Sequence, residues 1–399
     1  MHPGKLIVGK ASKTRSMIIV GTGGILAFGA IGIWSGNEKF YRQFLSPFFA
    51  SMDPEVSHRA AVFVAKHHLL KNRKYSDPQI LKTRIGSLNL PNPVGMAAGF
   101  DKSAECMSGL ARMGFGWIEI GSVTPLPQDG NPKPRVFRLQ EDSAIINRYG
   151  FNNEGHRQVH ERVLEFKTKY PSVIVGVNLG ANKTSTDRIQ DYCEGVKVFS
   201  DVADYLVINI SSPNTPNLRE LQQGDNLSDL LQRVIKVRNS QSRLVPLFLK
   251  VAPDLSEGDM KSICNCVSRK ETRVDGLIVS NTTTSREILK TESNVKLEPG
   301  GLSGAPLENI STELVAKFYK ELQGDIPIIG VGGVCDGAGA FRKITAGASA
   351  IQLYTALAFS GPGIVDRIKT ELSTVLRSNG FDSIEDAVGS SPRKEADKK

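Results

Sequence analysis

One pattern repeats through most of the sequence: a short apolar run, a loop rich in Gly, Asn or Ser, and a stretch with helical periodicity. It occurs eight times after residue 92. Strands that alternate with helices pair in parallel, and eight such units close into a barrel. The sequence therefore predicts an α/β fold, a (β/α)8 TIM barrel, with a doubly wound open sheet as the alternative. The expected strands are 93–98, 117–121, 173–178, 205–210, 247–251, 276–280, 326–331 and 350–354.

Polar residues or glycines stand at the carboxyl end of nearly every apolar run. Asn, Ser and Gly also end strands for turn reasons, so each position alone says little. Eight of them in register are different, because the active sites of TIM barrels lie at this face. We expect one pocket there, formed by Gly99, Lys102, Gly121, Ser122, Asn178, Asn209, Lys250, Ser280, Asn281, Gly332, Gly333, Tyr354 and Thr355.

The glycines after the seventh run indicate a phosphate site. The stretch 330–337 reads G-V-G-G-V-C-D-G, and L-S-G at 302–304 adds a second flexible segment. Glycines let backbone N–H groups approach a phosphate, and a following helix presents its N-terminus to it. Sugar-phosphate isomerases, Schiff-base aldolases and flavin enzymes all fit this description.

Lys250, on the fifth expected strand, distinguishes these classes. A strand lysine that points into a barrel is either an imine-forming nucleophile or a fixed positive charge. An isomerase would need a carboxylate base, and Glu119 is the only acidic residue on an expected strand, where we expect it to point into the barrel wall. Amides, hydroxyls and two lysines suit a planar anionic ligand stacked on a flavin.

The loop after the fourth strand carries two serines in I-S-S-P-N-T, residues 210–215. A serine nucleophile of acyl transfer normally needs a histidine as its base. None of the six histidines is next to this loop in sequence; they are His2, His58, His67, His68, His156 and His160. Either the serines serve the turn, or the reaction is not acyl transfer.

Charge and cysteine content argue against nucleic acid and metal. The formal charge is +9, but residues 1–16 contribute +4 and residues 391–399 contribute +2, so the remainder is nearly neutral. No basic stripe with interleaved aromatics is present, and we expect no nucleic-acid partner. Five scattered cysteines, without zinc spacing, are expected to be free thiols, and no metal is expected.

The N-terminal region indicates a membrane protein. Residues 1–16 are basic, with Ser and Thr, as in a mitochondrial targeting segment. Residues 17–34 carry no charge and would form a transmembrane helix of roughly 27 Å; a cleaved signal or a buried helix are the alternatives. Two amphipathic helices within 38–72 would then lie on the lipid surface, or else form a hairpin packed on the barrel. The barrel is expected at 80–385 and a disordered tail at 390–399.

Several motifs together resemble the dihydroorotate dehydrogenase family. They are A-A-G-F-D-K (97–102), E-I-G-S-V-T-P (119–125), N-P-K-P-R-V-F-R-L (131–139), I-N-R-Y-G-F-N (146–152), G-V-N-L-G (176–180), N-I-S-S-P-N-T (209–215), K-V-A-P-D (250–254), N-T-T (281–283), G-G-L-S-G (300–304), G-V-G-G-V (330–334) and Q-L-Y-T-A-L (352–357). The resemblance covers about residues 38–385. The serine loop, the anchor and the helical pair are similar to the membrane-bound, quinone-reducing class.

The resemblance implies an FMN enzyme that oxidises (S)-dihydroorotate to orotate in the fourth step of de novo pyrimidine biosynthesis. Ser212 would take the C5 proton while a hydride leaves C6 for the flavin. The implied FMN contacts are Ala97, Ala98, Gly99, Lys102, Ser122, Asn178, Asn209, Lys250, Ser280, Ser303, Gly304, Gly332, Gly333, Tyr354 and Thr355. The implied substrate contacts are Lys102, Asn147, Arg148, Tyr149, Gly150, Phe151, Asn209, Asn214, Asn281 and Thr282.

The same resemblance implies that ubiquinone enters between the N-terminal helices to reoxidise the flavin. The implied quinone-site residues are Phe48, Phe49, Ser57, His58, Ala61, Arg135 and Tyr354. Ser280 replaces the usual threonine of a hydroxyl relay from the base. The expected location is the inner mitochondrial membrane, crossed once, with the barrel toward the intermembrane space. A Schiff-base aldolase using Lys250 and a non-catalytic membrane-tethered barrel are the alternatives.

Overall fold

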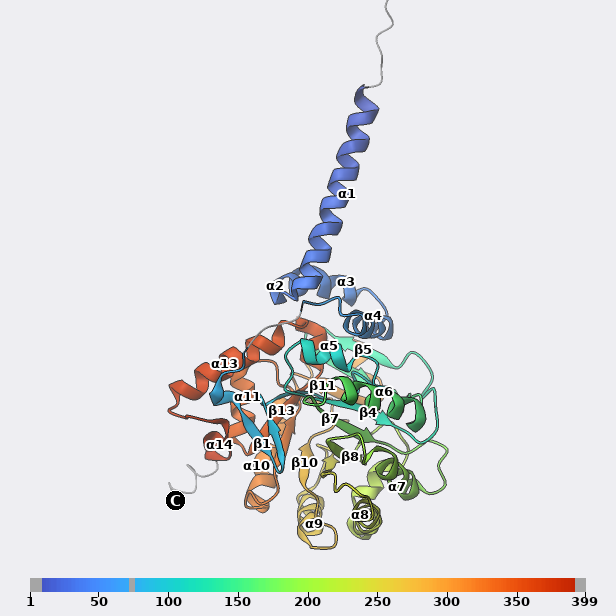
Figure 1. Ribbon diagram of the computed structural model, residues 1–399, viewed down its shortest axis with the longest axis vertical. Coiled ribbons are helices and arrows are strands. Elements are labelled where there is room, and N and C mark those ends of the chain that lie inside the picture. The colour runs from blue at the N-terminus through green and yellow to red at the C-terminus, as the bar shows by residue number, and fades with distance from the viewer. Residues whose placement is uncertain (1–8, 72–75, 392–399) are drawn as a thin grey trace, which may run out of the picture.

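The computed structural model describes residues 9–71 and 76–391. A long helix stands clear of a rounded body, and a small group of helices lies where the two meet (Figure 1). Residues 1–8 and 392–399 lie outside the described residues. The structure therefore omits half of the predicted targeting segment at 1–16 and most of the predicted tail at 390–399.

Eight strands form a closed barrel in which every neighbouring pair is parallel. Each lies within, or overlaps, one of the eight predicted apolar runs, so the barrel is confirmed and the open sheet is wrong. The strands, in chain order, are β3 (Val94–Met96), β4 (Trp117–Val123), β7 (Ile174–Leu179), β8 (Tyr205–Asn209), β9 (Leu247–Val251), β10 (Gly276–Val279), β12 (Ile328–Val331) and β13 (Ala348–Leu353).

Amphipathic helices surround the barrel because each has one apolar face to bury against the strands. Helix α9, for example, begins with a capping box in which Ser256 and Asp259 satisfy each other's backbone N–H groups. The helices are α5 (Met107–Arg112), α6 (His156–Lys169), α7 (Arg188–Phe199), α8 (Gly224–Asn239), α9 (Glu257–Ser268), α10 (Leu307–Glu321), α11 (Gly337–Thr345), α12 (Thr355–Ser360), α13 (Ile364–Ser378) and α14 (Ile384–Ala387).

Two small antiparallel sheets were not predicted. Strands β1 (Thr83–Ile85) and β2 (Leu88–Leu90) form a hairpin before the barrel. Strand β6 (Ala144–Asn147) pairs with β5 (Val136–Leu139) on one side and with β11 (Gly301–Gly304) on the other. Three 3₁₀ turns complete the body, at Gln79–Leu81, Leu218–Gln222 and Asn294–Leu297. The second sheet lies over the carboxyl end of the barrel and supplies residues to its mouth (Figure 1).

Large apolar side chains fill the amino-terminal half of the barrel interior. Trp117, Tyr205 and Phe248 are at most 1% exposed and pack against one another. Ile85 and Leu90 of the hairpin belong to the same cluster, so β1 and β2 cover this end. We call this cluster the barrel plug; it consists of Ile85, Leu90, Trp117, Tyr205, Val207, Phe248, Ile278, Ile329 and Ala350.

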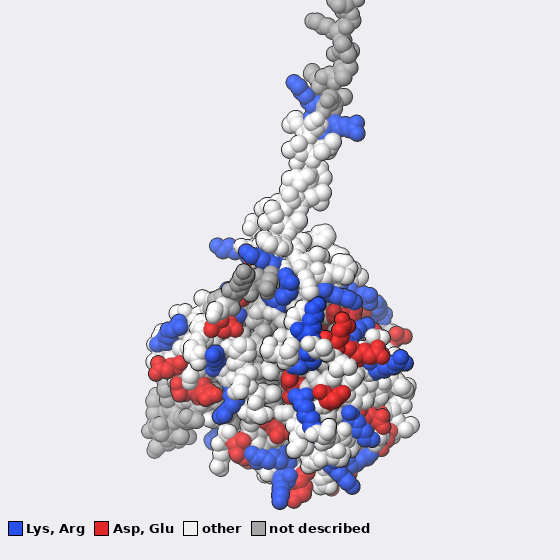
Figure 2. All heavy atoms as spheres, viewed as in Figure 1, with Lys and Arg blue, Asp and Glu red and all other residues white. Residues whose placement is uncertain are grey.

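Helix α1 (Gly9–Ser35) contains the predicted membrane span and begins eight residues before it. Its segment Arg15–Ser35 has a mean hydropathy of 2.0 and is long enough to cross a membrane, and no residue of its most apolar stretch is buried inside the protein. Figure 2 shows that the surface of this stretch carries no charged side chain, and that basic side chains lie at its far end and at its base. The alternative of a helix buried in the body is therefore wrong for this segment.

The helices that follow α1 lie between residues 38 and 66. Helix α2 (Glu38–Phe40), a π-helical turn (Tyr41–Leu45) and α3 (Ser46–Ala50) run on continuously. Helix α4 (Pro54–Lys66) begins after the N-cap Asp53, whose carboxylate accepts the N–H groups of Glu55 and Val56, both at 2.9 Å. Phe44, Phe48 and Phe63 are each about half exposed, so this group presents aromatic rings outward at the base of α1.

Candidate functional site

A cavity of about 1090 Å³ reaches from the base of α1, between the helices α2–α4, to the carboxyl ends of the barrel strands. Most of the predicted site residues line it, including Ser212. Those of the predicted cofactor set are Ala97, Ala98, Gly99, Lys102, Ser122, Asn209, Lys250, Ser280, Ser303, Gly304, Gly332, Gly333, Tyr354 and Thr355. Apart from residues shared with the cofactor set, the lining residues of the predicted substrate set are Asn147, Tyr149, Gly150, Phe151, Asn214, Asn281 and Thr282.

Four predicted residues do not line this cavity. Asn178 lies beneath it, fully buried. Arg148 turns away to pair with Glu298 at 2.6 Å and to stack on Phe137. Phe48 of α3 is about half exposed and does not face the cavity, and Arg135 is held by other partners, described below.

The serine loop lies at one side of the barrel mouth and is fixed by an arginine. Arg219 donates to the carbonyl oxygen of Ser211 at 3.0 Å and to that of Thr282 at 2.9 Å, and it pairs with Asp254 at 2.8 Å. It therefore ties together the loops that follow β8, β9 and β10. Ser212, in the first of these loops, is 6% exposed, and its Oγ accepts the N–H of Asn214 at 3.3 Å.

Amide side chains form a continuous network across the mouth. Asn209 Nδ2 donates to Ser122 Oγ at 2.9 Å and to Asn178 Oδ1 at 3.0 Å, and Ser122 Oγ also donates to Asn178 Oδ1. Asn281 Nδ2 donates to Asn209 Oδ1 at 3.2 Å and to Ser211 Oγ at 3.0 Å. Because each amide is held by its neighbours, the mouth presents fixed donors and acceptors to a ligand.

Lys102 brings a cation to the barrel mouth, in addition to Lys250. Its Nζ donates to the carbonyl oxygen of Gly99 at 2.7 Å and lies 4.0 Å from the ring centroid of Tyr149. Burial lowers the pKa of Lys102 to about 8, while the charge of Glu55 acts in the opposite direction. At neutral pH this lysine is mostly protonated and suits an anionic ligand.

Lys250 and Glu119 meet inside the barrel. The Lys250 Nζ lies 3.7 Å from Glu119 Oε1, and both side chains are at most 6% exposed. Glu119 thus points into the interior rather than into the barrel wall, which corrects its predicted orientation. The pairing suits a fixed positive charge on Lys250 better than an imine-forming nucleophile, which must react as a neutral amine.

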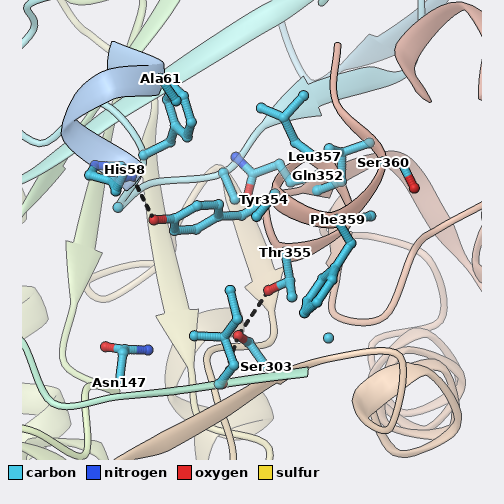
Figure 3. Close-up of a pocket in the computed structure, with 18 of the residues that line it drawn as sticks. His58, Ala61, Asn147, Ser303, Gln352, Tyr354, Thr355, Leu357, Phe359 and Ser360 are labelled. Carbon is cyan, nitrogen blue, oxygen red and sulfur yellow. Dashed lines mark hydrogen bonds between the residues drawn. The ribbon is translucent and has the colours of Figure 1, made fainter. Parts of the chain in front are cut away.

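The glycine loop after β12 lines the cavity and lies against the first residues of α10. Gly332 and Gly333 have φ of +116° and +74°, and a Cβ at Gly333 would lie 2.4 Å from Glu308 Cα. Any larger residue would thus displace backbone that borders the cavity. Thr355 and Ser303 line the same cavity, and Thr355 Oγ1 donates to Ser303 Oγ at 2.9 Å (Figure 3).

On the helical side, the residues of α3 and α4 that line the cavity are mainly apolar, and a polar contact lies at the inner end. Tyr354 and His58 lie within hydrogen-bond distance there (Figure 3). Burial lowers the pKa of His58 well below its usual value and raises that of Tyr354 well above. The lining residues of α3 and α4 are Phe49, Pro54, Ser57, His58, Ala60, Ala61 and Val64.

We call the part of the cavity between α3 and α4 the apolar passage. Arg138, and not Arg135, is the arginine that lines it. Arg138 lines the cavity and donates to the carbonyl oxygens of Phe49 at 2.7 Å and Met52 at 3.0 Å, and to Ser57 Oγ at 2.8 Å. Arg135 instead makes a bidentate pair with Glu55, at 2.7 and 3.1 Å. Strand alternation explains the difference, because Arg138 shares a face of β5 with cavity-lining Val136, two residues away.

Within residues 9–71 and 76–391, no group of three or more His, Cys, Asp and Glu side chains is placed to hold a metal ion. All five cysteines are free thiols, four of them buried. Burial raises the pKa of Cys264 to about 12 and that of Cys335 to about 11, so neither is poised as a thiolate.

Comparisons with known proteins identify the family of this chain. The profile of the dihydroorotate dehydrogenase family matches residues 80–376. A Mus musculus relative named mitochondrial dihydroorotate dehydrogenase (quinone) is 46% identical over 380 residues, which cover 93% of this chain and 95% of the relative. A relative of the same name from Oryza sativa is 45% identical, with 87% of this chain and 79% of the relative covered.

The solved structures agree as well. The crystal structure of DHODH from Eimeria tenella in complex with ferulenol superposes with a TM-score of 0.81 at 40% identity, covering 84% of this chain and 95% of that one. The ligand-free form of that protein gives the same TM-score. Fold, site and relatives together show that the chain belongs to the dihydroorotate dehydrogenase family, on its quinone-dependent branch.

Proposed function

We propose that this protein is a mitochondrial, membrane-associated enzyme that oxidises (S)-dihydroorotate to orotate through FMN, with ubiquinone as the electron acceptor. The reaction is the fourth step of de novo UMP synthesis. The observation that carries the proposal is the single cavity that joins the polar barrel mouth to the apolar passage between α3 and α4. Such a cavity offers one polar and one apolar reactant access to the same place.

The residues at the barrel mouth fit FMN. Gly332 and Gly333 line the cavity without side chains, so a phosphate could approach their backbone, and the hydroxyls of Ser303 and Thr355 line the same cavity. Lys250 and the amide of Asn209 suit the polar edge of an isoalloxazine ring. When bound, FMN would supply the redox chemistry: it would take a hydride from C6 of dihydroorotate and pass the electrons to quinone.

Ser212 is proposed as the base that accepts the C5 proton. A carbon acid next to a carbonyl needs only a positioned acceptor when donors and cations nearby stabilise the developing negative charge. Asn147, Asn214 and Asn281 surround the cavity near Ser212, and Lys102 supplies positive charge. Ser280, which also lines the cavity, would connect the hydroxyl of Ser212 to solvent as part of a relay.

The N-terminal part is proposed to place the enzyme on the inner mitochondrial membrane. Helix α1 would cross the bilayer once, with the barrel toward the intermembrane space and residues 1–16 serving import. The exposed rings of Phe44, Phe48 and Phe63 would then lie among lipid headgroups and acyl chains. Ubiquinone would enter from the lipid between α3 and α4, past Arg138, to the inner contact of His58 with Tyr354.

An anaerobic absorbance experiment on the detergent-purified protein tests the proposal. We expect a yellow protein whose flavin absorbance is bleached by dihydroorotate and restored by a soluble ubiquinone analogue. A colourless protein that takes up no FMN would contradict the proposal. Covalent trapping of Lys250 by borohydride with a carbonyl substrate would instead favour the aldolase alternative, and a flavin that dihydroorotate does not reduce would favour the non-catalytic barrel.

A further inference from the structure

Glu119 is the centre of a hydrogen-bond cluster inside the barrel. Its Oε1 accepts from Asn178 Nδ2 at 2.9 Å, and its Oε2 accepts from Gln352 Nε2 at 2.7 Å and from the hydroxyl of Tyr205 at 3.2 Å. Lys250 Nζ is 3.7 Å from Oε1. These four partners come from β7, β13, β8 and β9, while Glu119 itself is on β4. One carboxylate therefore connects five of the eight barrel strands.

The carboxylate lies one layer below the cavity floor. Lys250 and Gln352 line the cavity, whereas Glu119 does not and is 0% exposed. On the other side are Trp117 and Tyr205 of the barrel plug. Glu119 therefore cannot touch a ligand in the cavity and must act through the residues above it.

The charge of Glu119 is held in an environment that screens it poorly. A buried carboxylate is strongly unfavourable unless it is paired and hydrogen-bonded, and here three donors and one ammonium serve it. Its nearness raises the pKa of Tyr205 further, beyond the effect of burial. In such surroundings a charge influences a neighbouring site far more than it would in water.

The Lys250 ammonium combines a fixed position with free donors. Glu119 is its charge partner, and in the described part of the chain its Nζ makes no direct hydrogen bond to a protein acceptor. Its N–H groups therefore remain available to a ligand in the cavity. Glu119 both holds this ammonium in place and offsets its charge.

We propose that Glu119 is a positioning residue that sets the reduction potential of the bound flavin through Lys250. The inference rests on the proposed function, because it requires a flavin at the barrel mouth. A two-electron-reduced flavin is more electron-rich than the oxidised form, so a nearby positive charge raises the potential and a nearby negative charge lowers it. Glu119 thus keeps the potential below the value that Lys250 alone would give.

The test is an equilibrium redox titration of the full-length, detergent-purified holoenzyme against a dye of known potential. Glu119→Gln keeps the size of the side chain and removes its charge. We expect the ratio of reduced to oxidised flavin at a fixed potential to rise about tenfold, which is about 30 mV toward positive potential for a two-electron couple. An unchanged potential in a variant with full flavin content would overturn the inference.

Tyr205→Phe is the matched control, because it removes one hydrogen bond to Glu119 but keeps both charges and the packing of the ring. We expect its potential to stay close to that of the unmodified protein. An equal shift in Tyr205→Phe and Glu119→Gln would show that the hydrogen bonds around Glu119, and not its charge, set the potential, and would also overturn the inference.

Glu119→Asp provides a second route if Glu119→Gln yields too little holoenzyme. The shorter side chain keeps the charge but draws it away from Lys250, and we expect a smaller shift in the same direction; no shift would count against the inference. The proposed function is judged separately, on the unmodified protein. If that protein binds no flavin, or if dihydroorotate does not reduce the flavin, the proposed function is wrong. If dihydroorotate reduces the flavin normally but the substitutions at Glu119 leave the potential unchanged, only the role of Glu119 is wrong.

Discussion

The hydroxyl oxygen of Tyr354 lies 3.3 Å from Nδ1 of His58 and joins the barrel to helix α4. Tyr354 directly follows strand β13, and the two rings pack at 6.2 Å between centroids, next to Phe100. Since burial lowers the pKa of His58 and raises that of Tyr354, both are neutral near neutral pH. The inner end of the apolar passage therefore carries one hydrogen bond between uncharged groups.

This contact leads to the first prediction, for His58→Ala. We expect flavin reoxidation by a ubiquinone analogue to slow about tenfold, because one buried hydrogen bond contributes roughly 1 kcal/mol and the ring packing is lost as well. Flavin reduction by dihydroorotate should stay nearly unchanged. Stopped-flow measurement of the two half-reactions separates these effects. Arg59→Ala, an exposed neighbour on α4, is the control, and equal slowing of both half-reactions by His58→Ala would contradict the prediction.

The second prediction concerns Ser212→Ala. Removing the proposed base should lower the limiting rate of flavin reduction by about 10²–10⁴-fold, the usual contribution of general base catalysis. Flavin content and reoxidation by quinone should not change, since Ser212 is on the serine loop and not on the helical side of the cavity. Ser211→Ala is the matched control: its Oγ bonds to Asn209 and Asn281, so it should raise KM for dihydroorotate and retain the limiting rate. Rapid reduction in Ser212→Ala would exclude it as the base.

The third prediction contrasts the two arginines near β5. Arg138→Ala removes the hydrogen bonds that hold the turn between α3 and α4, so KM for quinone should rise about tenfold and amide exchange over 46–57 should accelerate.

Arg135→Ala should act on stability instead. It leaves the largely buried Glu55 carboxylate without its bidentate partner, and we expect a loss of about 2 kcal/mol in the free energy of unfolding, measured by denaturant titration. If both variants changed the same quantity, either KM for quinone or the free energy of unfolding, the two arginines would not have the separate roles that we expect.

The fourth prediction concerns stability against pH. His156 is buried at the start of α6 against Phe199, and burial lowers its pKa to about 4. Between pH 6.5 and 4 the unfolded chain therefore binds a proton that the folded chain does not, and stability is lost as the pH falls. Between pH 7 and 5 this should amount to about 2 kcal/mol. His156→Phe should lessen the fall by that amount in denaturant titrations at both pH values; parallel curves for the two proteins would refute the assignment.

The sequence was sufficient for the barrel because its eight strands are buried on both sides and read as apolar runs. Strand β5 was missed because V-F-R-L is only four residues long and is interrupted by Arg138, so it does not read as an apolar run. Arg135 was predicted instead of Arg138 because residues 131–139 were compared as a motif. The two-residue period of a strand places Val136 and Arg138 on the same face, and this would have favoured Arg138.

The environment of Glu119 could not be read from the sequence. Its partners Asn178, Tyr205, Lys250 and Gln352 are 59 to 233 residues away, and only the closure and register of the barrel bring them together. Arg219 is a similar case, since the three loops that it joins meet only in space. Long-range pairing of this kind leaves no periodic signal in one sequence.

The barrel plug has a consequence for how reactants and inhibitors share the enzyme. With Trp117, Tyr205 and Phe248 filling one end, no molecule can travel along the barrel axis, so exchange is confined to the end that faces α3 and α4. A lipid-soluble compound lodged between these two helices would stop turnover while leaving the water-soluble reactant bound. Its inhibition would then persist at saturating concentrations of that reactant and would weaken only when more quinone enters the bilayer.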